Sequence, residues 1–154
     1  MTDHKEKATE LFYQGCNCSQ AVFAAFCDIT GIGYEEALKM ASPFGGGLGR
    51  LRETCGAVSG MALAAGCLYG YNDITDPEKK KEVYALTAGM ANKFKAEMGS
   101  IICKELLGLE NYEYSPEAQP RTPEFYQTRP CPKCIATAAG ILDDVIREKR
   151  NELK

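Results

Sequence analysis

The chain has 154 residues, of which 45% are hydrophobic and 25% are charged, and its net charge is −3. This length and composition predict one soluble globular domain over residues 1–154. The weakly acidic balance gives no electrostatic reason to expect nucleic acid or an anionic membrane as a partner. The first ten residues are polar and charged and contain no secretory signal, so we expect a cytoplasmic protein.

Apolar residues recur at helical spacing through most of the chain, and no segment has the alternating pattern of a convincing strand. Gly15 and Gly99 each follow such a periodic segment, and Asp76-Pro77 is a favourable helix start. Residues 54–71 carry no charge but are rich in Gly, Ala and Ser, which favours a tightly packed buried helix over membrane insertion. Helices are expected at about residues 3–14, 18–30, 34–41, 54–70, 77–98, 103–107 and 132–152.

Two segments interrupt the helical pattern. Residues 42–49, with the sequence SPFGGGLG, are too rich in glycine for a regular element, since glycine serves where the backbone takes left-handed angles or approaches another group. Residues 113–129 contain several breakers and little periodicity. The predicted fold is an all-α helical bundle with a Gly-rich loop and a long irregular connection before the last helix. The residues expected in its core are Ala8, Leu11, Phe12, Ala21, Val22, Ala25, Phe26, Ile135, Ala138, Ala139, Leu142, Val145 and Ile146.

The chain contains eight cysteines but no export signal. In a reducing compartment such thiols act as ligands, redox groups or small core residues rather than as a disulfide scaffold. Cys27 and Cys67 lie in the middle of predicted helices and are expected to pack in the core, whereas Cys16 is open to either role. The eight are Cys16, Cys18, Cys27, Cys55, Cys67, Cys103, Cys131 and Cys134.

Four of these cysteines fall at the predicted beginning of a helix. Asn17 is the expected cap before the second helix, and Thr54 is the expected cap before the fourth. Free amide N–H groups and the helix dipole favour a thiolate at such a position, and the thiolate is both the nucleophile and the metal ligand. If the four converge, they can hold zinc or an iron–sulfur cluster; without a metal they are candidate catalytic redox thiols. The four are Cys18, Cys55, Cys103 and Cys131.

Cys131-Pro132-Lys133-Cys134 is a C-x-x-C motif, which indicates redox or metal chemistry. Ile135 follows it in place of the histidine that covalent c-type haem attachment requires. The sequence around the motif shows no β-α-β unit, which a thioredoxin-like protein would have. Because positions three apart share a helix face, Cys134 either joins the same metal site or packs in the core.

The glycines near these cysteines allow two interpretations. The Gly-rich loop with Arg50 and Arg52 has the composition of an anion-binding nest, but it lacks the Gly-Lys-Ser/Thr ending of a P-loop. We favour an approach of the backbone to the cysteine site or to a packed helix. Gly56, Gly60 and Ala64 share one helix face, and close helix packing alone would explain them equally well. The candidate cofactor contacts are Gly45, Gly46, Gly47 and Gly56.

His4 is the single histidine, and it lies in an N-terminus that we expect to fray. A Ser-His-Asp triad or a His-rich zinc site is therefore not expected. Asp and Glu are scattered over polar faces and show no paired spacing for acid–base catalysis.

Several short segments match a known family in order: NCSQAV at 17–22, FGGG at 44–47, TCGAVSG at 54–60, CKELLG at 103–108, and Cys131 before the last helix. With these segments the chain resembles the C_GCAxxG_C_C family, redox-active proteins of bacteria and archaea, especially anaerobes. The resemblance implies a redox role without a known substrate, and it identifies Cys18, Cys55, Cys103 and Cys131 as the defining cysteines. The family is similar to the non-haem portion of split-Soret cytochromes, where an iron–sulfur centre is suspected.

Three hypotheses follow. The first is an iron–sulfur protein that exchanges electrons with a redox partner protein or a small-molecule donor or acceptor. The second is a thiol–disulfide oxidoreductase that uses helix-start cysteines and no metal. The third is a structural zinc or interaction protein. Whether the chain is an oxidoreductase or an electron carrier stays open, and its glycine faces make a homodimer a plausible assembly.

Overall fold

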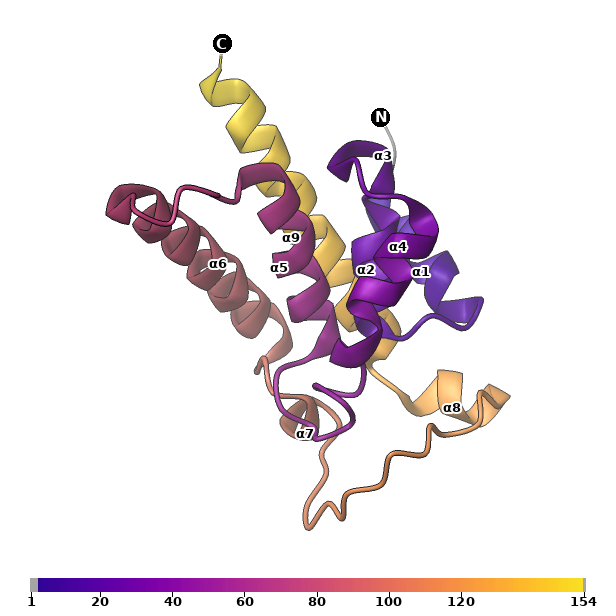
Figure 1. The fold of residues 1–154 in the computed structure, drawn as a ribbon. Helices are drawn as coiled ribbons and strands as arrows, with labels where there is room; N and C mark the ends of the chain where they lie inside the picture. Colours follow the sequence, from indigo (N-terminus) through magenta and orange to yellow (C-terminus); the bar gives the residue numbers. More distant parts are fainter. Residues whose placement is uncertain (1–2, 154) are drawn as a thin grey trace.

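The computed structural model describes residues 3–153, and the chain folds as a bundle of helices (Figure 1). The predicted all-α fold is confirmed. Within this range the only β pairing is one isolated antiparallel bridge between Thr54 and Ile102. The helices are α1 (His4–Tyr13), α2 (Cys18–Ala25), α3 (Cys27–Thr30), α4 (Tyr34–Ala41), a 3-10 turn η1 (Ser42–Phe44), α5 (Gly56–Tyr69), α6 (Pro77–Met98), α7 (Cys103–Leu106), α8 (Pro123–Thr128) and α9 (Cys131–Glu152).

Helix α9 is the central element of the bundle. Helices α1, α2, α5 and α6 all pack against it, and α2 also packs against α1, α4 and α5. Figure 1 shows α6 on one side of α5 and α9, with α1, α2 and α4 on the other. The apolar residues expected in the core of α1, α2 and α9 are all buried, with at most 7% of their surface exposed. Burial of each large apolar side chain stabilises the fold by roughly 1.5–3 kcal/mol.

The contact between α2 and α5 is close because α5 presents glycine there. A Cβ atom on Gly60 would lie 2.6 Å from the carbonyl oxygen of Ser19 and 3.2 Å from Cβ of Val22. The expected glycine face of α5 therefore packs against α2 backbone.

Among residues 3–153, none of the helices combines the length and the hydropathy that a membrane span requires.

Local capping explains most helix boundaries. Asp3 caps α1 by accepting hydrogen bonds from the amides of Lys5 and Glu6. Asn17 and Gln20 form a reciprocal capping box at the start of α2. At the far end of α6, Gly99 takes the left-handed conformation with φ +94° that commonly terminates a helix.

Two predictions of secondary structure are wrong, one about a continuous helix and one about an irregular segment. The helix expected over residues 18–30 breaks at Phe26, whose ψ of 12° ends α2 and lets α3 begin at Cys27. The connection expected to be irregular over 113–129 contains the short helix α8. The Thr122 side chain caps α8 by accepting a hydrogen bond from the amide of Phe125, and Pro123 occupies the first turn.

The expected core position of Cys67 is wrong, whereas Cys27 does pack against the core, at its edge. Cys27 is half-buried because the helix break places it at the start of α3 rather than in a helix interior. Cys67 is exposed. It lies near the end of α5 together with exposed Gly66 and Gly70, outside the face that packs in the core.

His4 is not frayed, contrary to expectation. Only 4% of the residue is exposed. Its Nδ1 lies 2.6 Å from a carboxylate oxygen of Asp143, and its Nε2 lies 2.9 Å from one of Asp28. The ring stacks on Phe26 with a centroid distance of 4.1 Å. The imidazole therefore joins α1 to α3 and α9, although the local sequence around it is polar.

Candidate functional site: a sulfur-lined cavity

The four cysteines predicted at helix starts do occupy helix starts. Cys18, Cys103 and Cys131 are the first residues of α2, α7 and α9. Cys55 is itself the N-cap of α5, so the expected capping role of Thr54 is wrong. Thr54 lies instead in the β bridge to Ile102.

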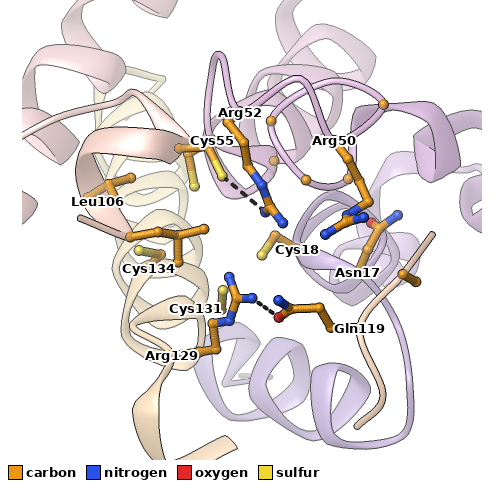
Figure 2. A pocket seen from close by; sticks show the side chains of 18 of the residues that line it. Asn17, Cys18, Arg50, Arg52, Cys55, Leu106, Gln119, Arg129, Cys131 and Cys134 are labelled. Carbon is orange, nitrogen blue, oxygen red and sulfur yellow. Dashed lines mark hydrogen bonds between the residues drawn. The ribbon is translucent and has the colours of Figure 1, made fainter. Parts of the chain in front are cut away.

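These helix starts meet at one end of the bundle, around a cavity of about 500 Å³. The Gly-rich loop, α7 and α8 lie at this end (Figure 1). Figure 2 shows the sulfur atoms of labelled cysteines directed into the pocket from different segments of the chain. The cysteines that line it are Cys18, Cys55, Cys103, Cys131 and Cys134. The structure thus joins Cys134 to the four expected residues, whereas Cys16, Cys27 and Cys67 are not among the lining residues.

Four of the thiols form two hydrogen-bonded pairs. Cys18 shares a hydrogen bond with Cys131, and Cys134 shares one with Cys55. Each pair therefore joins α9 to another helix start. A donated hydrogen bond stabilises a thiolate, so the acceptor of each pair is the sulfur that ionises more readily.

The pKa values of the first pair separate accordingly. The hydrogen bond to Cys131, assisted by burial, raises the pKa of the Cys18 thiol well above its ordinary value. The same hydrogen bond lowers the pKa of Cys131 to about 7 against the opposing effect of burial, and the positive charges of Arg129, Arg121 and Arg52 lower it further.

The second pair behaves in the same way. The hydrogen bond from Cys134 lowers the pKa of Cys55 against the effect of burial, and the amides of Ala57 and Val58 at the start of α5 also lower it. The hydrogen bond to Cys55 raises the pKa of Cys134 far above its ordinary value. One sulfur in each pair is therefore predisposed to carry negative charge.

Backbone hydrogen bonds hold Cys103 beside Cys55. The amide of Cys103 donates to the carbonyl of Glu53 at 2.6 Å, and the amide of Cys55 donates to the carbonyl of Ile101 at 2.7 Å. The Arg52 guanidinium donates to the Cys103 sulfur at 3.6 Å. Burial raises the pKa of Cys103, and the nearby guanidinium partly offsets that effect.

The Gly-rich loop approaches the cysteines as closely as its composition suggests. Gly47 has a φ of +73°, and a Cβ atom there would lie 2.6 Å from Cβ of Cys103. A Cβ atom on Gly45 would overlap the Asn17 side chain, and one on Gly56 would lie 3.2 Å from Cβ of Cys18. These glycines let the backbone pack against the sulfur site; their contact with a cofactor stays a prediction.

A roof that sequence reasoning missed covers the cavity. It consists of the segment after α7, which supplies Tyr114, Pro116 and Gln119 to the lining, together with α8. Arg50 donates to the carbonyl oxygens of Ser115 and Glu117 in this segment.

Two further arginines secure the roof. Arg121 donates to the carbonyl oxygens of Phe12 and Cys16 and lies over the ring of Phe125. Arg129 donates to the side-chain oxygen of Gln119 (Figure 2). The segment has no periodicity, so the only local indication of its role was the presence of arginines and aromatic residues among its breakers.

The comparisons with known proteins identify the family of this chain. A sequence model of the family described as "Putative redox-active protein (C_GCAxxG_C_C)" matches residues 16–145. The chain belongs to this family. The matched range contains all five cavity cysteines. The name of the C_GCAxxG_C_C family writes its central motif as Gly-Cys-Ala-x-x-Gly, whereas this chain reads Cys55-Gly56-Ala57, with the first two residues in the opposite order, followed by Gly60.

A relative from Archaeoglobus fulgidus, described as an uncharacterized protein, is 33% identical over 110 residues. The matched region covers 66% of this chain and 72% of the relative. No solved structure matches the chain.

The cavity supplies cysteine sulfur, the donor that both iron–sulfur clusters and structural zinc sites take from proteins. Among residues 3–153, no three His, Cys, Asp or Glu side chains are grouped so that they could hold one metal ion. A zinc site places its sulfur ligands about 2.3 Å from one point. In a cluster each thiolate binds its own iron, so its sulfur ligands need not share one point.

Proposed function

We propose that this C_GCAxxG_C_C protein binds an iron–sulfur cluster through Cys18, Cys55, Cys103 and Cys131 and transfers electrons. One observation carries the proposal: four cysteines distant in the sequence converge at helix starts around a single cavity. The membership of a redox-active family supports the same class of chemistry. The partner that gives or takes the electrons would be a redox protein or a small-molecule donor or acceptor.

Bound in this cavity, a cluster would supply reversible one-electron chemistry. The chain supplies the environment that sets the potential. The helix-start amides of Ala57 and Val58 face the Cys55 sulfur, and Arg52 donates to the Cys103 sulfur. Hydrogen bonds and positive charge at the sulfur atoms favour the reduced state. Cys134 shares a hydrogen bond with Cys55, so it would serve as a hydrogen-bond donor to that ligand or as an alternative ligand.

The test is anaerobic reconstitution with ferrous iron and sulfide, followed by iron and acid-labile sulfide analysis. We expect a coloured protein with iron and sulfide in equal, stoichiometric amounts. Serine substitution of any of the four proposed ligands should lower the bound iron sharply. Cys27→Ser and Cys67→Ser are matched controls outside the cavity and should retain it.

Circular dichroism of each variant separates loss of the cluster from loss of the fold. A folded protein that stays colourless and free of iron after reconstitution would overturn the proposal. Zinc alone, with unfolding on chelation, would support the structural zinc protein instead.

A second candidate function rests on a separate observation, the two hydrogen-bonded thiol pairs. In a metal-free protein, the Cys131 thiolate would attack a disulfide of a partner, forming a mixed disulfide and releasing one partner thiolate. Cys18 would then lose its proton and attack the Cys131 sulfur, releasing the second partner thiol. Two electrons pass to the partner, and Cys18 and Cys131 remain as a disulfide.

This second candidate predicts trapped intermediates. The Cys18→Ser variant of the metal-free protein should accumulate a mixed disulfide at Cys131 with an added aromatic disulfide. The Cys67→Ser variant should instead proceed to the internal disulfide, as the unmodified protein does. If all eight thiols react slowly and alike, thiol–disulfide exchange is not the function.

A further inference from the structure

Arginine side chains gather around the sulfur cavity, although the chain as a whole is acidic. The lining residues in the described part of the chain include no Asp, Glu or Lys. None of the ion pairs found among residues 3–153 involves one of these arginines. The arginines are Arg50, Arg52, Arg121 and Arg129.

Three of these arginines have structural partners. Arg50 and Arg121 donate to backbone carbonyl groups, and Arg129 donates to Gln119. Their positions are therefore explained by attachment of the roof. Their charge still raises the electrostatic potential at the cavity, because charges beside low-dielectric protein walls are screened less than charges in bulk water.

Arg52 has no comparable explanation. Only 6% of the residue is exposed, and its guanidinium extends into the pocket towards Cys18 (Figure 2). One nitrogen donates a long hydrogen bond of 3.6 Å to the Cys103 sulfur. Its Nε is buried and has no hydrogen-bond partner. The Tyr112 ring lies 5.3 Å from the guanidinium carbon and helps to fix its orientation.

A buried charged donor without a partner is energetically unfavourable, and such donors in native proteins normally face a ligand, an ion or water. The guanidinium group binds carboxylate and phosphate oxygens through two parallel hydrogen bonds. The Nε and a terminal nitrogen of Arg52 can form one such pair.

The cavity has the size and lining of a small-molecule site. Its volume of about 500 Å³ lies within the range of roughly 300–1,000 Å³ that is typical of such sites. The lining also includes apolar side chains, those of Phe12, Leu106, Leu107, Tyr114 and Phe125. A ligand that satisfies both the arginines and these side chains has an oxyanion at one end and an apolar body.

We propose that the cavity binds a small organic oxyanion, a carboxylate or a phosphate ester, through the buried Arg52 guanidinium, beside the sulfur atoms. The binding claim stands on the arginines and the cavity alone. The further step, that this anion is the molecule oxidised or reduced, rests on the proposed redox function.

Isothermal titration of the full-length, iron-free, reduced protein tests the binding claim. The probes are benzoate and phenyl phosphate, with benzamide as an uncharged match for benzoate. We expect saturable binding of at least one anion and at least about tenfold weaker binding of benzamide. The stronger of the two anions identifies the carboxylate or the phosphate as the preferred group. Equal or absent binding of all three probes would overturn the proposal.

The Arg52 Nε–H resonance in a nitrogen-15 spectrum locates the bound anion on the unmodified protein. The anion should shift this resonance, and benzamide should not. Arg52→Gln should weaken anion binding about tenfold or more, and Arg52→Lys should weaken it less because the charge remains. Arg147→Gln, on the exposed part of α9, is the matched control and should bind as the parent does.

The two proposals fail in different ways. If Arg52→Gln does not fold, the resonance shift on the unmodified protein decides the question. An anion that binds without moving that resonance, or that binds Arg52→Gln normally, would show that Arg52 serves only the thiolates or a cluster. Anion binding to a protein that never takes up iron would uphold the site and reject the cluster.

Discussion

The thiols of Cys18 and Cys131 form a hydrogen bond that connects the first residue of α2 to the first residue of α9. The two helices come from opposite parts of the chain. Their hydrogen bond raises the pKa of Cys18 and lowers that of Cys131, so the two sulfur atoms differ in how readily they ionise. Reactivity in the metal-free protein should therefore be unequal between the two.

We predict that iodoacetamide modifies Cys131 of the iron-free protein with a midpoint near pH 7, since the pKa of Cys131 is lowered to about 7. Below that pH the rate should fall about tenfold per pH unit as the thiolate is protonated. Cys18→Ala removes the donor, so the pKa of Cys131 should rise and the midpoint should move to higher pH. Peptide mass spectrometry measures the rate at each cysteine.

Cys67 is the internal control for this measurement. The residue as a whole is exposed, but neighbouring atoms partly desolvate its sulfur, which raises the pKa of the thiol. Cys67 should therefore react slowly at pH 7. An unchanged midpoint for Cys131 in the Cys18→Ala variant would show that the hydrogen bond does not set its pKa.

Gly47→Ala should disturb the sulfur site, whereas Gly49→Ala should not. Both glycines have positive φ, so each alanine costs about 1–2 kcal/mol of stability. Only at Gly47 does the new Cβ atom meet Cys103, at 2.6 Å, and this overlap should add roughly 1–3 kcal/mol. Urea unfolding gives the free energies.

Reconstitution measures the effect of these two substitutions on the site. The iron content of Gly47→Ala should fall while that of Gly49→Ala stays at the parent level. Equal stability and equal iron content in the two variants would contradict the close approach of the loop.

Gly60→Ala and Gly66→Ala lie in the same helix and should have opposite effects. The new Cβ atom at residue 60 would meet the Ser19 carbonyl at 2.6 Å, and overpacking of this kind costs about 1–3 kcal/mol. At residue 66 nothing lies within 4 Å, so alanine should stabilise α5 by roughly 0.5–1 kcal/mol. The shift of the thermal unfolding midpoint measures both, and a stabilising Gly60→Ala would show that α2 and α5 are not in close contact.

His4→Ala should destabilise the protein by about 1–3 kcal/mol, because it leaves the partly buried carboxylate of Asp143 without its partner. Burial already raises the pKa of Asp143, and the hydrogen bond from His4 opposes that rise. Without His4 the pKa should rise further, so the variant should lose most stability at neutral pH. The difference from the parent should shrink as the pH falls and Asp143 becomes protonated.

His4→Phe separates stacking from hydrogen bonding at this position. It keeps an aromatic ring against Phe26 but offers no donor to Asp28 or Asp143. Urea unfolding at several pH values should show that His4→Phe is less stable than the parent. This loss of stability should shrink as the pH falls, as it does for His4→Ala. A pH-independent loss in both variants would show that the carboxylates do not depend on the imidazole.

The sequence was sufficient for the helices because their information is local. Asp76 and Gly99 bracket α6 as expected, and the apolar spacing identifies the buried faces of α1, α2 and α9. The break at Phe26 was missed because nothing in the surrounding residues opposes a continuous helix. Tertiary contacts of α3 with α5 and α2 decide it.

The candidate site was predictable in its cysteines but not in its surroundings. Helix-start chemistry is readable from neighbouring residues, as Asn17 before Cys18 shows. The pairing of Cys134 with Cys55 joins two helices and follows only from their packing. The same holds for Arg121 and Arg129, whose partners lie in elements that no local pattern connects.

The bridge between Thr54 and Ile102 has a consequence for how the site tolerates change. Each partner of the bridge immediately precedes a cysteine. The backbone hydrogen bonds between the two segments therefore fix the position of Cys55 relative to Cys103. Deleting a single residue beside either one would misalign both sulfur atoms at once. Lengthening the tip of the α5–α6 connection, between the same two cysteines in sequence, should leave their spacing intact.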